Sequence, residues 1–338
     1  MQIDKDISQR ISIARIVMIF GIVILHLPPH QPLAEVGQDF FSYVRAFFSY
    51  GVFRASVPVL TAVSGYLVFK FALAQQPRLL LKKKSKTILL PLLLWNMPLA
   101  AAIFIAQMYH LSDHPFSAQL YPFTLDAWLD GLFGLYTQPV NYPLNFLRDL
   151  YAVCLLSPLL LLLLRVNFIL TVACLAAVYY WNLDGMLVIR NSMLISFATG
   201  AMVAWYAVDP RKLDRFAWML FTLFIGFCIY LVLFKVENRE GLRMLAPFLI
   251  WPILGKLAAS ALGNHLVRYS KYSFILFMSH APVILILWYL FGKPEHGENS
   301  YLLYWLTAAP LSLIIAILMH KVMTKFSPRL KGLMLGER

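Results

Sequence analysis

The sequence predicts an all-α polytopic membrane protein with about ten transmembrane helices and both termini in the cytoplasm. Apolar residues make up 60% of the 338 positions, charged residues make up only 13%, and the mean hydropathy is +0.70. Soluble globular proteins carry about 25% charged residues, so the composition excludes that class. We expect a single transmembrane domain over residues 1–338, with no separate soluble domain.

Ten apolar stretches approach the length of about 20 residues that a helix needs to cross a bilayer. The first is followed by Pro28 and Pro29 and by no small-residue cleavage site, so we expect it to remain in the protein. Prolines interrupt several of the others, and a helix bundle tolerates this where neighbouring helices satisfy the freed backbone groups. The stretches lie at 11–27, 50–71, 87–109, 147–164, 167–183, 190–207, 215–234, 243–262, 272–292 and 301–323.

The distribution of the cations predicts the orientation. Of the 29 Lys and Arg residues, 20 flank the spans on the side of the N-terminus, 8 flank the opposite side, and Lys256 falls inside a span. Because Lys and Arg concentrate in cytoplasmic loops, both termini are expected in the cytoplasm. The net charge of +13 is then a signal of topology, and we expect no nucleic-acid partner. The three cysteines are isolated in separate spans, which predicts neither a disulfide framework nor a metal site.

The first span carries two polar side chains, Arg15 and His26. At ~100° per residue their eleven-residue separation places them on one helix face, roughly 16 Å apart. An Arg in the middle of a membrane helix costs roughly 2.5–3.5 kcal/mol, so such residues usually face protein or water and carry function. The alternative is that Arg15 reaches the headgroups and that His26 marks the membrane interface.

The densest basic cluster, Lys82 to Lys86, follows the second span in a predicted cytoplasmic loop. It has two interpretations. The first is anchoring on anionic lipid, worth ~1 kcal/mol per cation near the surface. The second is a site for a phosphorylated cytosolic ligand, because Lys83 and Lys86 one helical turn apart would face the same way.

The outer segment 110–146 is rich in aromatic residues and contains three acids and no cation. Such a composition fits a carbohydrate site, because sugar C–H faces stack on rings and sugar hydroxyls need polar partners. It fits an interfacial half-helix around Trp128 equally well. Tyr142 and Asn145 at its end are candidates for binding a sugar.

Further polar residues lie within or beside the spans. Arg148 and Asp149 are adjacent, so we expect them to point different ways around a helix and to have separate partners. Arg54 lies just inside the outer end of the second span, and Ser64-Gly65 predicts close helix packing deeper in it. His280, inside the ninth span, has the usual interpretation of a hydrogen-bonded core residue.

Motifs that recur in one order cover nearly the whole chain: Arg15 with His26; Arg54, Val57, Pro58, Ser64, Gly65 and Tyr66; Lys82 to Lys86 with Pro91 and Trp95; FLRDL at 146–150; and YSF with SHAPV between 272 and 283. The ordered set resembles the acyltransferase 3 family of integral membrane O-acyltransferases, whose members mostly modify extracytoplasmic glycans. The chain departs from the family pattern at Lys83 and Lys86, where Arg-x-x-Arg is frequent, and at Asn145, where Trp is common. Lysines keep the charge but lose the bidentate fork for phosphate.

The resemblance implies an enzyme that moves an acyl group, most simply acetyl, from cytosolic acyl-CoA to a hydroxyl of an extracytoplasmic or lipid-linked sugar or exopolysaccharide. It implies a bacterial inner-membrane protein in contact with membrane lipids and with glycan-biosynthesis machinery, and no metal. We expect His26 to act as general base or acyl carrier, with Asp149 orienting it, and Arg148 or Arg54 to stabilise the oxyanion. The residues expected to bind the CoA phosphates are Arg15, Lys83 and Lys86. The residues expected to contact the acceptor are Arg54, Tyr142, Asn145 and His280.

Two other classes of function stay open from the sequence. A transporter or flippase for a lipid-linked saccharide would suit ten spans with intramembrane polar residues, but it predicts repeated broken helices in two halves, and the sequence shows no such repeat. A noncatalytic subunit of a glycan-export complex would make Arg15 and His26 dispensable.

Overall fold

A computed structural model describes residues 3–111, 118–183, 185, 187–188, 190, 192–293 and 297–336, and these residues form helices and connecting turns without strands. Within them, eight helical stretches are long and apolar enough to cross a membrane. Two shorter apolar helices, α8 (Phe168–Tyr180) and α9 (Ser192–Trp205), coincide with the remaining predicted spans. The expectation of about ten apolar helices is confirmed.

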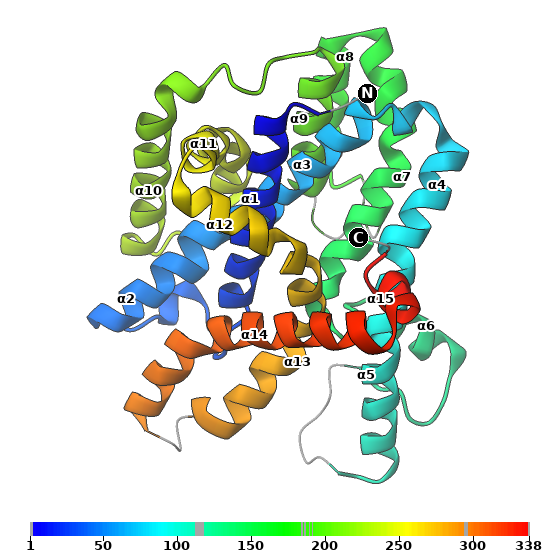
Figure 1. The fold of residues 1–338 in the computed structure, drawn as a ribbon, viewed down its shortest axis with the longest axis vertical. Coiled ribbons are helices and arrows are strands. Elements are labelled where there is room, and N and C mark those ends of the chain that lie inside the picture. The colour runs from blue at the N-terminus through cyan, green and yellow to red at the C-terminus, as the bar shows by residue number, and fades with distance from the viewer. Residues whose placement is uncertain are drawn as a thin grey trace.

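The helices follow one another in a single bundle (Figure 1). The first half of the chain forms α1 (Lys5–Leu25), α2 (Phe40–Ala46), α3 (Ser56–Lys70), α4 (Pro77–Lys84), α5 (Leu90–Met108), α6 (Leu125–Phe133) and α7 (Asn145–Val166). After α8 and α9 come α10 (Ala217–Leu233), α11 (Glu240–Ala258), α12 (Ala261–Tyr269), α13 (Ser273–Leu287), α14 (Glu298–Phe326) and α15 (Pro328–Met334).

Helix α1 runs through the middle of the bundle and contacts α3, α11, α12 and α13 (Figure 1). Its first turn is capped by Asp4, whose carboxylate accepts a hydrogen bond from the Asp6 backbone N–H at 3.0 Å. The helix ends at Leu25, and Pro28 and Pro29 beyond it have no N–H to continue it. This central position buries most of the apolar side chains of α1 against neighbouring helices.

Helices α3 and α9 pack with their backbones in contact. A Cβ added to Gly65 would lie 2.0 Å from the Phe197 carbonyl oxygen, and one added to Gly200 would lie 1.8 Å from that of Ala62. Only glycine fits at such an approach. The prediction of close helix packing at Ser64-Gly65 is confirmed.

Residues that the charge pattern assigned to one side of the membrane lie together. At the N-terminal end of α1, Arg10 binds Asp214 through two hydrogen bonds of 2.8 and 2.6 Å, and Arg211 pairs with Asp4 at 3.0 Å. At the opposite end, the Lys235 amine donates to the carbonyl oxygen of Ala34 at 2.8 Å. These contacts join loops that are about 200 residues apart in sequence, and they agree with the predicted orientation.

Two predicted boundaries were wrong. The second span begins at Phe40, because α2 continues through a π-helical turn, η2 (Phe47–Gly51), and a 3-10 turn, η3 (Val52–Ala55), into α3. The predicted basic loop is helical, because α4 continues through a π-helical turn, η5 (Ser85–Leu89), into α5.

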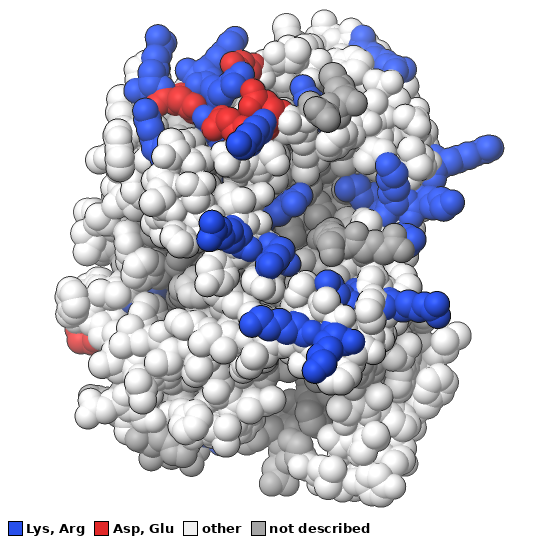
Figure 2. Space-filling view, viewed as in Figure 1, with Lys and Arg blue, Asp and Glu red and all other residues white. Residues whose placement is uncertain are grey.

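The helix α15 lies against this second helical stretch. The Trp95 indole N–H donates to the Met334 carbonyl oxygen at 3.1 Å, and a Cβ on Gly336 would lie 2.8 Å from the Thr87 Cα. Figure 2 shows Lys and Arg side chains over α4, α12, α14 and α15 on one face, with acidic side chains gathered near the N-terminus. The basic cluster therefore belongs to a larger positively charged surface than the sequence indicated.

The outer segment 110–146 is described except for residues 112–117, which lie outside the described structure. Its helix α6 packs on α5, with the Trp128 ring 5.7 Å from that of Phe104 between centroids. The Asp130 carboxylate accepts hydrogen bonds from the backbone N–H groups of Tyr136 and Thr137 at 2.6 and 3.0 Å. Trp128 therefore packs within the protein, and the segment has a defined conformation around Asp130.

Candidate functional site

Two histidines from opposite ends of the chain meet at the outer end of α1. His26 follows the last residue of α1 and is half-buried, whereas His280 in α13 is fully buried. The Nε2 atom of His280 lies 3.2 Å from the Nδ1 atom of His26. The Nδ1 atom of His280 lies 2.7 Å from the Phe277 carbonyl oxygen. His280 is thus held by its own helix and in turn contacts His26.

This chain of contacts assigns the proton positions in two neutral rings. The Phe277 carbonyl can only accept, so Nδ1 of His280 carries a hydrogen and its Nε2 is an acceptor. The Nδ1 atom of His26 must then donate to that Nε2. His26 is left with an unprotonated Nε2, and a nitrogen in this state can accept a proton or attack a carbonyl.

Tyr142 packs against His26. The two rings meet edge to face, with centroids 5.2 Å apart and an interplanar angle of 80°. The hydroxyl of Tyr142 is buried and has no hydrogen-bond partner among the described residues. A buried polar group without a partner is costly, and such groups in native proteins commonly await a ligand. A residue with an unpartnered hydroxyl therefore packs against the His26 ring.

The adjacent Arg148 and Asp149 bind each other, contrary to our expectation that they point apart. The Arg148 guanidinium lies 2.8 Å from the buried Asp149 carboxylate and also donates to the Leu187 carbonyl oxygen at 2.9 Å. The length of the arginine side chain lets it fold back over its neighbour. Nearby, Arg190 donates to the Asn145 side-chain oxygen at 2.9 Å. The imidazole seen in contact with His26 is that of His280.

Arg54 and His30 also lie near His26, and each acts electrostatically on its imidazole. The Arg54 Nε donates to the Ser49 carbonyl oxygen at 3.0 Å, and its guanidinium carbon lies 5.5 Å from the centre of the Tyr50 ring. Burial and, next, the charge of Arg54 lower the pKa of His30. The outer end of α1 is therefore positively charged.

The expected donor-binding residues lie away from this outer end. Arg15 is exposed although Ala14 and Ile16 beside it are buried, and it has no hydrogen bond or ion pair within the described part of the chain. Lys83 and Lys86 are also exposed, at the junction of α4 and the η5 turn. All three cations are accessible to a ligand.

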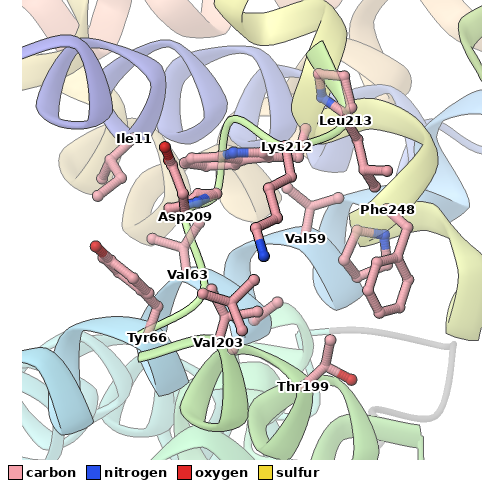
Figure 3. A pocket seen from close by; sticks show the side chains of 17 residues that line it. Ile11, Val59, Val63, Tyr66, Thr199, Val203, Asp209, Lys212, Leu213 and Phe248 are labelled. Atoms are coloured by element: carbon pink, nitrogen blue, oxygen red, sulfur yellow. The ribbon is translucent and has the colours of Figure 1, made fainter. Parts of the chain in front are cut away.

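A cavity of about 160 Å³ lies near the N-terminal half of α1 (Figure 3). Its lining is mostly apolar, with Ile11, Val59 and Val203 among its members, and Asp209 and Lys212 are its charged residues. It contains none of the predicted site residues. Ile11 is 15 positions before His26, or about 22 Å along a helix, so this cavity is separate from the histidine pair.

Comparison with known proteins decides the class. The family model described as "Acyltransferase domain" matches residues 9–321. The chain belongs to this acyltransferase family. A relative, the succinoglycan biosynthesis protein ExoH of Rhizobium meliloti (strain 1021), is 30% identical over 353 aligned positions, which cover 99% of this chain and 94% of the relative. No solved structure matches.

Family membership confirms the resemblance inferred from the motifs. The protein is a multi-pass membrane acyltransferase, which weighs against the transporter and the noncatalytic subunit. Sequence reasoning missed His30 and Arg190 and took His280 for a residue that contacts the acceptor. His30 lies one turn after His26, and Arg190 is the single cation ahead of its span, so spacing offered a weak signal for both. No sequence signal linked His280 to His26, 254 positions away.

Proposed function

We propose that this acyltransferase moves an acyl group, acetyl in the simplest case, from cytosolic acyl-CoA to a hydroxyl of an extracytoplasmic or lipid-linked sugar of a polysaccharide. The observation that carries the proposal is the histidine pair, which leaves Nε2 of His26 unprotonated. The Tyr142 ring packs against His26, and its hydroxyl has no partner among the described residues. The relative's name, a succinoglycan biosynthesis protein, supports a polysaccharide as the acceptor.

In the direct form of the reaction, Nε2 of His26 takes the proton of the acceptor hydroxyl as its oxygen attacks the thioester carbonyl. The carbonyl oxygen becomes an oxyanion, and the Tyr142 hydroxyl is the donor we assign to it. When the C–S bond breaks, the thiolate of CoA takes the proton from His26. The same unprotonated nitrogen would serve a relay through an acyl-histidine, so both routes remain within the proposal.

The remaining site residues receive supporting roles. His280 has both ring nitrogens engaged, so we assign it to positioning His26 instead of contacting the acceptor. Arg148 and Asp149 form an ion pair on α7, and Arg190 holds the side chain of Asn145 on the same helix. Arg54 is assigned to the acceptor.

The donor is assigned to the opposite side. Arg15, Lys83 and Lys86 would bind the phosphates of acyl-CoA, and the pantetheine arm would extend along α1 towards His26. The separation of Arg15 and His26 along the helix, eleven residues or roughly 16 Å, is of the order of that arm. We place the protein in the bacterial cytoplasmic membrane, in contact with membrane lipids and with glycan-biosynthesis machinery.

The test is release of free CoA by the purified protein from labelled acetyl-CoA, with transfer of label to glycan. We expect His26→Ala to lose at least about 100-fold in turnover, because general-base catalysis contributes about 10²–10⁴-fold. His265→Ala, which removes an exposed imidazole of α12, is the matched control and should keep full activity. Near-normal turnover in folded His26→Ala would refute the assignment.

A further inference from the structure

A cavity of about 250 Å³ opens at the outer end of α1. Leu25 and Leu27, the sequence neighbours of His26, line it on one side, and His30 lines it further along the chain. Arg45 of α2 and Arg54 of the η3 turn line it on the other side. The cavity is therefore next to the proposed catalytic residue, and its charged lining residues are both arginines.

The two arginines of this cavity have no carboxylate partner among the described residues. Arg45 donates to the Tyr301 hydroxyl at 2.8 Å. Within the described part of the chain, the Ser49 carbonyl oxygen is the one hydrogen-bond acceptor that Arg54 contacts. Both side chains are half-buried. A guanidinium withdrawn from water normally pairs with an anion, because desolvation of its charge is otherwise uncompensated.

The surroundings increase this positive charge. Arg239 also lies over the Tyr50 ring, with its guanidinium carbon 4.9 Å from the ring centre, so Tyr50 contacts two guanidinium groups. Two acids of the neighbouring loop are already engaged, since Glu237 pairs with Arg239 at 2.7 Å and Glu240 binds Arg243. Arg190 and Arg243 add like charge to the electrostatic environment of Arg54. The cavity therefore holds an excess of fixed positive charge.

The size of the cavity restricts its ligand. Ligand pockets for drug-sized molecules start at about 300 Å³, so this cavity suits one sugar ring or a smaller group. Its position beside His26 means that a group bound here would be part of the substrate that reacts. Carboxylates match the planar fork of arginine, which binds them through two parallel hydrogen bonds.

We propose that Arg45 and Arg54 bind a carboxylate of the acceptor, so that the acceptor is an acidic sugar unit of the glycan. This inference rests on the proposed function for the identity of the reaction. It specifies the chemical class of the acceptor, which neither the family nor the relative's name supplies.

The test measures binding without donor, so that it does not depend on acyl transfer. The probes are methyl β-glucuronide and methyl β-glucoside, two sugars that differ only in a carboxylate or a hydroxymethyl group at C6. The readout is the thermal midpoint of the purified protein in lipid nanodiscs, at constant ionic strength. Inorganic pyrophosphate serves as a third probe, because the diphosphate of a lipid-linked sugar is another source of negative charge.

We expect the glucuronide to raise the midpoint and the glucoside to leave it unchanged. Arg45→Gln and Arg54→Gln should each need at least about tenfold more glucuronide for the same rise in the thermal midpoint. Arg54→Lys should keep part of the response. Arg165→Gln, which removes the same charge from an exposed position at the end of α7, should respond as the wild type does.

Equal responses to the two sugars, or no response to either, would overturn the proposal even if every arginine variant failed to fold. A response to pyrophosphate alone would also overturn it and would assign the cavity to a diphosphate. If the wild-type protein responds to the glucuronide but releases no CoA from acetyl-CoA, the proposed function is refuted and the acidic-sugar site stands.

Discussion

Replacing His280 by leucine tests the mechanism most directly, because His280 is fully buried and touches no substrate in the proposal. The substitution removes the acceptor for Nδ1–H of His26, which lies 3.2 Å away. His26 is then free to carry its proton on Nε2, the nitrogen that should act as the base. We expect a loss of turnover with little change in the KM for acyl-CoA.

The magnitude follows from the hydrogen bond that is lost. Leaving a buried donor without its partner costs about 1–3 kcal/mol, which corresponds to a loss of about 5- to 150-fold. His26→Ala removes the base itself and should cost more, about 10²–10⁴-fold. His280→Leu should therefore fall between the wild type and His26→Ala. His280→Gln, which can place an acceptor near the position of Nε2, should recover part of the loss.

The assay is the steady-state rate of CoA release over a range of acyl-CoA concentrations and of pH. A purely structural role would lower the amount of folded protein but leave kcat per folded molecule and its pH profile unchanged. Wild-type kcat in folded His280→Leu would refute the proton assignment and return His280 to the hydrophobic core.

Three further outcomes are expected. Tyr142→Phe should lower kcat by about 10²-fold and leave thermal stability unchanged, as measured by CoA release and melting, because its hydroxyl has no protein partner to lose. Arg15→Ala and the double variant Lys83→Ala/Lys86→Ala should raise the KM for acyl-CoA by about 10- to 150-fold with kcat preserved, and equal CoA affinity in titrations would contradict this. Although burial alone would raise the pKa of Asp130, its hydrogen bonds from Thr137 and Tyr136 outweigh burial and lower it. The stabilisation by ionised Asp130 is thus present above the unfolded pKa of about 3.9 and is lost as pH falls through the folded pKa. Proteolysis of the 118–146 segment should therefore rise below about pH 4. The Asp130→Asn variant should be cleaved faster already at neutral pH.

The number and order of the helices could be predicted because each span is a local run of apolar residues. Boundaries were harder, since α2 and α4 are joined to the following helices by π-helical turns that no apolar count reveals. The prediction that Ser64-Gly65 packs closely succeeded because a glycine inside a membrane helix usually marks a point where two helix backbones approach each other.

Contacts between candidate residues could be predicted only within one helix, although Tyr142 and His280 were named as candidates and both meet His26 in the structure. Arg15 and His26 could be related by helical geometry alone, whereas the contact of His26 with His280 joins α1 to α13 and needs the tertiary fold. The pairing of Arg148 with Asp149 was mispredicted because helix periodicity fixes the direction of the Cα–Cβ bond and not the path of a long side chain. Periodicity therefore identified candidate residues but not their partners.

The placement of His26 at the outer end of α1 fixes the electrical balance of the proposed reaction. An acyl group would move outward from the thioester, while the proton of the acceptor hydroxyl would pass through His26 to the thiolate and return inward with CoA. Each acyl group that leaves is thus matched by one proton that enters, and no net charge crosses the bilayer. Such an exchange is electroneutral, so the membrane potential would neither drive nor oppose modification of the glycan, and its free energy would come from the thioester bond.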